Sequence, residues 1–299
     1  MVKPQLPKLV LRVRFPLSAY RGARAPFLQE EKMGVSLKIM SYNVRTSGAP
    51  DGINVFANRK ERLVEIIEKE SPDIIGLQEL TDESRDYLRS SLPGYTFFGS
   101  GRDADYHGEH SEICVKNQGM EVIEMRNHFL SFTPNVPGNT FGGDQSPCPR
   151  MYTILKIKHD RSNQLFSFAN THLDHVGNRA KLFGTMQILQ DLNNQKLPFI
   201  LTGDFNALPK DDVVSLVLHM PGKKVQDCTR MLGTTYHGYG IHPYCNRMQE
   251  GETSPDKIDY IFTDLSWDES ESRVVEDVPV NGVYASDHYA VVTRIHLPD

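Results

Sequence analysis

Two short polar segments near the C-terminal end hold side chains suited to phosphoester hydrolysis. They are residues 203–206 (GDFN) and 286–288 (SDH), and each adjoins an apolar run typical of a strand. This chemistry needs oxygen ligands for a divalent cation, a carboxylate that activates water and a histidine that handles charge at phosphorus. The residues of these types are Asp204, Asn206, Asp287 and His288. The two segments therefore indicate one shared hydrolytic site.

Similar polar groups stand at the ends of other predicted strands. In layered α/β folds, ligands bind beyond the ends of strands, so groups placed there on several strands predict a single site. Five predicted strands carry such groups at or directly after an end. The groups are Asn43, Glu79, Asn170 with His172, Asp204 with Asn206, and Asp259 beside Asp287 and His288.

The elements that must position these groups alternate along the chain from residue 36. Strands are predicted over residues 37–42, 74–77, 95–98, 112–116, 120–126, 151–158, 164–170, 199–202, 258–262 and 290–296. Helices are predicted over residues 58–70, 81–91 and 178–192. The first begins at a capping box formed by Asn58 and Glu61, and the third carries Leu182, Met186 and Leu189 on one stripe. A loop rich in Pro, Gly and Asn, residues 133–149, is of the kind that covers a site.

Length and composition favour one globular domain without a membrane span. The chain has 299 residues, of which 39% are hydrophobic and 24% charged, with no change in composition that would divide it. No apolar stretch approaches the ~20 residues needed to cross a bilayer. The four cysteines match neither a redox pair nor a structural zinc site, so free thiols in a reducing compartment are expected.

The N-terminal segment differs from the rest of the chain. Residues 1–29 hold six basic residues, no acidic one and several prolines. We predict that residues 1–32 are a basic leader, disordered or added by the expression vector in preference to a targeting peptide, and that residues 33–299 form a single domain. Removing these six from the 33 basic residues leaves 27 against 38 acidic ones, a formal charge of −11. An acidic body works against non-specific binding of nucleic acid.

The chain resembles the endonuclease/exonuclease/phosphatase family, which shares the DNase I-like fold. The resemblance runs from about residue 37 to residue 297 and implies an α/β, four-layer α/β/β/α sandwich in which two packed mixed β-sheets are flanked by helices. It rests on six segments in the family's order: Ser41-Tyr42-Asn43-Val44, Leu77-Gln78-Glu79, Thr171-His172-Leu173, Gly203-Asp204-Phe205-Asn206-Ala207, Lys257-Ile258-Asp259-Tyr260-Ile261 and Ser286-Asp287-His288-Tyr289.

The resemblance implies a metal site. Glu79 would be the principal carboxylate ligand, Asn43 would hold the metal or a metal-bound water, and Asp287 would be the second carboxylate on the metal side. A ligand set dominated by oxygen suits Mg²⁺, with Mn²⁺ as a substitute, better than zinc.

It also implies the catalytic roles. Asp204 would orient and deprotonate the attacking water, and Asn206 would donate to a phosphate oxygen. His288 would contact the phosphate or act as a base, held in its tautomer by Asp259. His172 would stabilise negative charge on phosphate oxygens or serve the leaving group.

Residues expected to contact substrate lie around these motifs. Arg150 resembles an arginine that contacts phosphate in some members. His175 and Arg179 follow His172, and Tyr236 and His237 precede the Asp259 strand. These two stretches resemble a subgroup of mostly uncharacterised members, which names no substrate. The full set of predicted substrate-binding residues is Arg150, Asn170, His175, Arg179, Tyr236 and His237.

The expected function is Mg²⁺-dependent hydrolysis of a phosphomonoester or phosphodiester. The acidic body and the 133–149 loop favour a small phosphorylated metabolite or sugar phosphate over DNA or RNA. A nuclease is the first alternative, and a catalytically silent relative that binds a phosphorylated ligand is the second. No membrane or obligate protein partner is expected, and a cytoplasmic location is the default. Motifs of serine hydrolases, zinc proteases, P-loop proteins and dinucleotide-binding folds do not occur.

Overall fold

Twelve strands of the described residues form two six-stranded sheets. The structure is a computed structural model that describes residues 34–298, so the predicted leader, residues 1–32, lies outside the described residues. The first sheet has the order β11-β12-β1-β2-β4-β3 and the second β5-β6-β7-β8-β10-β9. The strands of the first sheet are β1 (Ser36–Asn43), β2 (Ile74–Leu80), β3 (Tyr95–Phe98), β4 (His110–Lys116), β11 (Ser266–Val274) and β12 (Val291–His296). Those of the second are β5 (Met120–Phe129), β6 (Met151–His159), β7 (Leu165–His172), β8 (Phe199–Asp204), β9 (Gln226–Asp227) and β10 (Asp259–Thr263).

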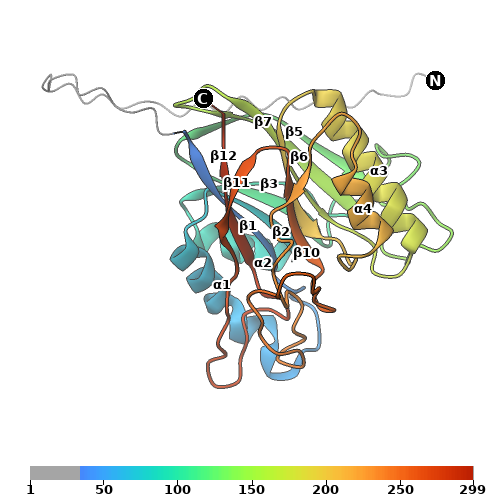
Figure 1. The fold of residues 1–299 in the computed structure, drawn as a ribbon. Coiled ribbons are helices and arrows are strands. Elements are labelled where there is room, and N and C mark those ends of the chain that lie inside the picture. The colour runs from blue at the N-terminus through green and yellow to red at the C-terminus, as the bar shows by residue number, and fades with distance from the viewer. Residues whose placement is uncertain (1–33, 299) are drawn as a thin grey trace, which may run out of the picture.

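Four α-helices cover the outer faces of the sheets. Figure 1 shows α1 and α3 on opposite sides of the paired sheets. The helices are α1 (Phe56–Glu70) and α2 (Asp82–Ser91) on the first sheet, and α3 (Asn178–Gln195) and α4 (Asp212–Leu218) on the second. A short 3₁₀ helix, Gly52–Asn54, precedes α1. The predicted four-layer sandwich with two mixed sheets is therefore confirmed.

Three apolar layers hold the sandwich together. Between the sheets, side chains such as Ile39 meet Phe168 and its neighbours. On the outer faces, Leu63 belongs to the layer under α1 and α2, and Ile188 to the layer under α3 and α4. Because both faces of each sheet are covered, the central strands are almost continuously buried up to the site.

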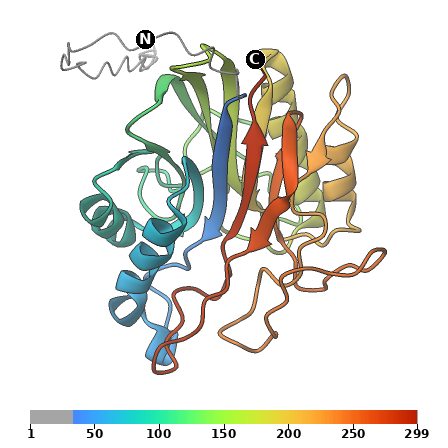
Figure 2. The ribbon, with the colours of Figure 1, turned by 60° about the vertical axis from the view of Figure 1, so that its left-hand side comes forward.

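Each sheet has a parallel pair at its centre, and these pairs bring the site together. β1 runs parallel to β2, and β7 runs parallel to β8. The two pairs face each other across the central layer, so four carboxyl ends meet at one end of the molecule, toward which β1 points in Figure 2. β10 is antiparallel to β8, and this register places Asp259 opposite Asp204.

A glycine allows the two sheets to approach closely below the site. A Cβ atom at Gly76 would overlap Thr202 Oγ1 and crowd Asn170 Oδ1. Asn170 fills this gap, accepting from Gln78 Nε2 at 2.7 Å and Thr202 Oγ1 at 3.0 Å and donating to Leu77 O at 2.8 Å. The side chain therefore ties the sheets together.

The helix boundaries differ from the prediction at two points. α1 begins at Phe56 with Val55 as its N-cap, and Asn58 donates to Ile53 O in place of capping, so the predicted capping box is wrong. In α3 the predicted stripe is only partly buried: Leu189 is in the core, whereas Met186 is 54% exposed. Small and polar residues of α3, such as Gly184 and Thr185, face the sheet instead.

Three elements were not predicted from the sequence. They are α4, β9 and the edge strand β11, whose sequence SWDESESRV is too polar to suggest a strand. The four cysteines are free, as predicted, although only Cys114 and Cys228 are fully buried. Within residues 34–298, no helix combines the length and the apolar character that crossing a bilayer requires.

Candidate active site

Glu79 reaches the site because β2 is irregular at this point. The pairing of β2 with β4 shifts register between Leu77 and Leu80, and Glu79 has a left-handed φ of 61°. Such a bulge redirects a side chain. The carboxylate accepts from Asn43 Nδ2 and from Thr46 N, both at 2.9 Å. Burial would raise the pKa of Glu79, but the Asn43 hydrogen bond and the charge of His288 outweigh it and lower the pKa.

Asn43 links two carboxylates at the end of β1. Its Nδ2 donates to Glu79 Oε1 at 2.9 Å and to Asp204 Oδ2 at 3.0 Å, while its Oδ1 accepts from Arg45 N. The amide therefore presents its nitrogen to the acidic groups. In this orientation Asn43 positions carboxylates, and direct ligation of a metal by its oxygen would require the amide to rotate.

Asp204 lies at the centre of the cluster. The carboxylate is 2% exposed and closes a turn by accepting from Asn206 N at 2.9 Å. Its Oδ2 lies 3.6 Å from His172 Nε2 and 3.8 Å from His288 Nε2. Burial and then the neighbouring Asp259 carboxylate raise the pKa of Asp204. A carboxylate with a raised pKa is a stronger base than an ordinary aspartate.

Asp259 and His288 form a buried ion pair. His288 Nδ1 lies 2.9 Å from Asp259 Oδ2. Burial alone would lower the pKa of His288, but the Asp259 carboxylate outweighs it and raises the pKa to about 10. His288 is thus an imidazolium at neutral pH. Of the two roles left open by the sequence, this protonation state favours contact with the phosphate over action as a base.

His172 and Asn206 lie on the other side of Asp204. Asn206 Nδ2 donates to His172 Nε2 at 3.1 Å and to Leu173 O at 3.1 Å. Asn206 has a left-handed φ of 46°, and its carbonyl accepts from the buried Lys181 of α3 at 2.8 Å. Burial, followed by the charges of Arg150 and Arg102, holds the pKa of His172 well below its ordinary value. His172 is therefore neutral, with its proton on Nδ1.

Asp287 is buried beside the positive charge of Arg45. Arg45 Nη1 lies 3.6 Å from Asp287 Oδ2, and the same guanidinium donates to Asp51 at 2.9 Å. Ser286 Oγ donates to Asn43 O at 2.7 Å, which fixes the SDH segment against the end of β1. Arg45 also has a left-handed φ, so this segment of the site holds backbone strain. No motif in the sequence indicated Arg45.

The donor set fits a hard divalent cation. Ligand atoms of Glu79, His172 and Asp204 lie within 4.8 Å of one another, as do those of Asp204, Asp259 and His288. The second group is engaged by the His288 ion pair, so Glu79 of the first group is the carboxylate best placed to hold a cation. Asp259 Oδ1 is buried without a hydrogen-bond partner among the described residues, a sign of excess negative charge. Carboxylate oxygens dominate, as Mg²⁺ and Mn²⁺ prefer.

A small pocket lined by two arginines adjoins His172. Arg150 is 5% exposed, and its Nη2 lies 2.9 Å from His175 Nδ1. Its Nε and Nη1 are buried without a hydrogen-bond partner among the described residues, which suits an incoming anion or hydroxyl. Arg102 and Glu109 line the same pocket. They come from the connection between β3 and β4, and the sequence offered no motif to indicate them.

Two predicted substrate-binding residues have structural positions instead. Asn170 is fully buried and satisfied between the sheets. His237 is also fully buried, stacked on Tyr289 with ring centroids 4.0 Å apart. Both corrections have one cause, because each side chain bonds backbone groups: Asn170 Nδ2 donates to Leu77 O and Glu112 O, and His237 Nδ1 accepts from Gly240 N at 3.1 Å.

The other three predicted substrate-binding residues remain at the surface or rim. Tyr236 is half-buried, with its ring 5.0 Å from that of His288. His175 and Arg179 are exposed, and Arg179 N donates to Asp144 of the 133–149 loop. In that loop Ser146 donates to Asp174, whose carboxylate lies 3.9 Å from Arg150 Nε. The loop thus borders the pocket beside His172.

The sequence profile of the endonuclease/exonuclease/phosphatase family matches residues 40–288, which is most of the chain and includes every motif of the site. The chain belongs to this family. A search of curated protein sequences gives no match.

Solved structures of the endonuclease/exonuclease/phosphatase family share the fold. A member from Bacteroides vulgatus is 25% identical with a TM-score of 0.74, covering 88% of this chain and 100% of its own. The mannosyl-6-phosphatase Bt3783 of Bacteroides thetaiotaomicron is 24% identical with a TM-score of 0.71, covering 87% and 100%. TDP2 of D. rerio, complexed with a single-strand DNA product, is 19% identical with a TM-score of 0.65, covering 88% and 99%.

Proposed function

We propose that the protein is a Mg²⁺-dependent phosphoesterase that hydrolyses a small phosphorylated metabolite, a sugar phosphate foremost. The observation that carries this proposal is the position of Asp204. Its buried carboxylate lies between the Asn43 and Glu79 side and the two histidines, His172 and His288. Members of the family are phosphoesterases, and this arrangement offers a base surrounded by groups that bind phosphate oxygens.

Asp204 orients the attacking water and accepts its proton. The raised pKa of Asp204 supports this role, because the base must hold a proton during the step. Glu79 and its neighbours would hold a divalent cation, which would supply a Lewis acid to neutralise charge developing on the phosphate.

The remaining side chains act on the phosphate and the leaving group. Asn206 Nδ2 and the His288 imidazolium donate to non-bridging oxygens, where preorganised donors stabilise developing charge. Asp259 keeps His288 protonated. His172 is neutral with its proton on Nδ1, and it lies next to the pocket, so we assign it to the side of the leaving group.

The preference for a small substrate has separate support. The formal charge of −11 over residues 30–299 opposes non-specific binding of a polyanion. One structural relative is a mannosyl-6-phosphatase. Another, TDP2, was solved with a DNA product, and a nuclease is therefore the second candidate.

Turnover of p-nitrophenyl phosphate with and without metal tests the proposal. We expect activity with Mg²⁺ or Mn²⁺, loss of activity in EDTA, recovery when metal is added back, and a fall in kcat of at least ~100-fold in Asp204→Asn. Asp86→Asn, an exposed change on α2, is the matched control. Full turnover in EDTA, or normal kcat in Asp204→Asn, would contradict the proposal.

A further inference from the structure

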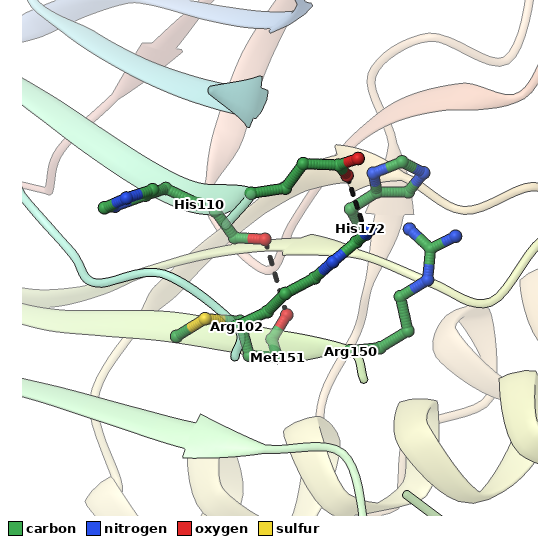
Figure 3. Close-up of a pocket in the computed structure, with 7 residues that line it drawn as sticks. Arg102, His110, Arg150, Met151 and His172 are labelled. Atoms are coloured by element: carbon green, nitrogen blue, oxygen red, sulfur yellow. Dashed lines mark hydrogen bonds and ion pairs between the residues drawn. The ribbon is translucent and has the colours of Figure 1, made fainter. Parts of the chain in front are cut away.

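The pocket beside His172 contains an ion pair that the proposed chemistry does not use. Arg102 Nη1 donates to Glu109 Oε2 at 2.6 Å, and both side chains are largely buried. A backbone hydrogen bond of 3.0 Å from Arg102 N to Glu109 O fixes the two residues side by side. Figure 3 shows Arg102 and Arg150 directed toward His172. Arg102 comes from the connection between β3 and β4, and Arg150 directly precedes β6. The pair is therefore held ready next to the reacting groups.

The fixed charges in and beside this pocket cancel. Two guanidinium groups, Arg102 and Arg150, stand against two carboxylates, Glu109 and Asp174, the latter 3.9 Å from Arg150. A second phosphate would therefore meet an acceptor, Glu109, as well as donors. A neutral group that both donates and accepts hydrogen bonds matches the pocket better.

Free hydrogen-bonding capacity remains on both sides. Arg150 Nε and Nη1 are buried without a hydrogen-bond partner among the described residues. A carboxylate such as that of Glu109 can accept from two hydroxyls at once. The cavity is small, about 10 Å³, which is room for about one water-sized group. The cavity therefore admits a hydroxyl group of a larger substituent, and it is too small for a nucleotide base with its sugar.

We propose that the Arg102–Glu109 pair, with Arg150, forms a subsite that binds hydroxyl groups of the substituent attached to the scissile phosphate. The substrate class is then a phosphomonoester of a sugar or open-chain polyol. This inference rests on the proposed function, because it takes His172 as the boundary between the phosphate and the leaving group. Glu109 accepts from the hydroxyls, and the guanidinium groups donate to their oxygens.

Two substrates of matched shape test the subsite. Glucose 6-phosphate and cyclohexylmethyl phosphate share a six-membered ring, and only the first carries hydroxyls. We expect wild-type kcat/KM to be at least ~10-fold higher for glucose 6-phosphate, as charged hydrogen bonds to a substrate provide. Glycerol 3-phosphate then distinguishes an open-chain polyol from a ring. Equal kcat/KM for the two ring substrates would overturn the inference.

Variants of the pair separate recognition from structure. Glu109→Gln and Arg102→Lys should each reduce the preference for glucose 6-phosphate by about 10-fold. Glu269→Gln is the control and should leave that preference unchanged, because Glu269 lies on β11 in an exposed pair with Arg230. An equal loss on both ring substrates would mean that the pair only supports the fold, and would also overturn the inference.

Calorimetry distinguishes failure of the subsite from failure of the proposed function. Binding of glucose 6-phosphate is measured in Asp204→Asn and in Asp204→Asn with Glu109→Gln. Weaker binding of at least ~10-fold in the double variant, with no such change for cyclohexylmethyl phosphate, supports the subsite even if wild-type protein turns over no phosphoester. Unchanged binding refutes the subsite even if p-nitrophenyl phosphate is hydrolysed.

Discussion

His288 owes its charge chiefly to one neighbour, with smaller contributions from Asp287 and Asp204. The Asp259 carboxylate, at 2.9 Å from Nδ1, outweighs the burial that would otherwise neutralise the imidazole. An asparagine at position 259 would keep the size of the side chain and remove the charge. His288 would then favour the neutral form and could no longer offer a cation to the phosphate.

We therefore expect Asp259→Asn to lower kcat by at least ~100-fold, because a charged donor is lost where charge develops in the transition state. KM should change much less. Steady-state kinetics with p-nitrophenyl phosphate and Mg²⁺ measure this effect. Asp191→Asn, which alters an ion pair between α3 and Arg126 of the edge strand β5, is the control. A normal kcat would show that His288 acts without its charge.

His237 is a neutral histidine whose proton position is constrained by its neighbours. Its Nδ1 accepts from Gly240 N at 3.1 Å, so protonation at Nδ1 would set two N–H groups against each other. Burial, followed by the charge of His288, lowers the pKa of His237 to about 3. In the unfolded chain the pKa of this histidine is about 6.5. The unfolded state thus binds more protons between these values, and stability falls as pH falls through that window.

We expect His237→Gln to flatten the pH dependence of stability. Between pH 7.5 and 5.0 the wild-type protein should lose about 2 kcal/mol through this residue, at about 1.4 kcal/mol per pH unit below 6.5. Urea unfolding in EDTA at the two pH values gives the difference. Exposed His219→Gln should leave it unaltered. If His237→Gln loses as much stability as wild type, His237 is charged in the fold.

At the scale of elements, strands were easier to predict than the connections between them. The central strands are short apolar runs that end in polar side chains, and this pattern is local. β11 was missed because it is an exposed edge strand whose polar sequence pairs only through β12. The start of α1 was misplaced because the 3₁₀ turn before it and buried Phe56 set the boundary, not a capping side chain.

The site divides in the same way. Motif residues at strand ends could be found because a single segment carries both the strand and the functional group. Arg102 and Glu109 could not, since they become neighbours of His172 only through packing of the β3–β4 connection against β6 and β7. His237 shows the opposite error: its motif suggested a substrate contact, but the side chain is buried and accepts a hydrogen bond from the backbone of Gly240.

The spacing of the sheets depends on Gly76. We expect Gly76→Ala to lower the free energy of unfolding by about 1–3 kcal/mol, because its methyl group would push against Thr202 and Asn170 from the opposite sheet. Activity should also fall as the strand ends shift. Gly94→Ala, with nothing within 4 Å of the added methyl group, is the control in the same denaturant experiment. Equal stability of the two variants would refute the close approach.

At the scale of the whole molecule, folding concentrates negative charge in one place. Glu79, Asp204, Asp259 and Asp287 lie far apart in the sequence and come together only in the folded state. A cation that binds the folded protein alone stabilises it by mass action. Metal binding should therefore be visible without any substrate.

We expect Mg²⁺ at ten times its dissociation constant to stabilise the fold by about 1.4 kcal/mol, which raises Tm by roughly 3–5 °C. Thermal unfolding in MgCl₂ and in NaCl of equal ionic strength separates binding from screening. Glu79→Gln should abolish the increase, and exposed Glu83→Gln should retain it. The same increase in Glu79→Gln would place the cation elsewhere.

The pairing of β1 with β12 sets Ser36 directly opposite His296. The two ends of the described part of the chain consequently lie next to each other. A short linker between residues 34 and 298 would join these ends, and fresh ends could be opened at the exposed turn around Gly222 without cutting a strand. Such a circular permutant would keep all of the catalytic strands in place, so the chemistry depends on which strands meet and not on which is made first.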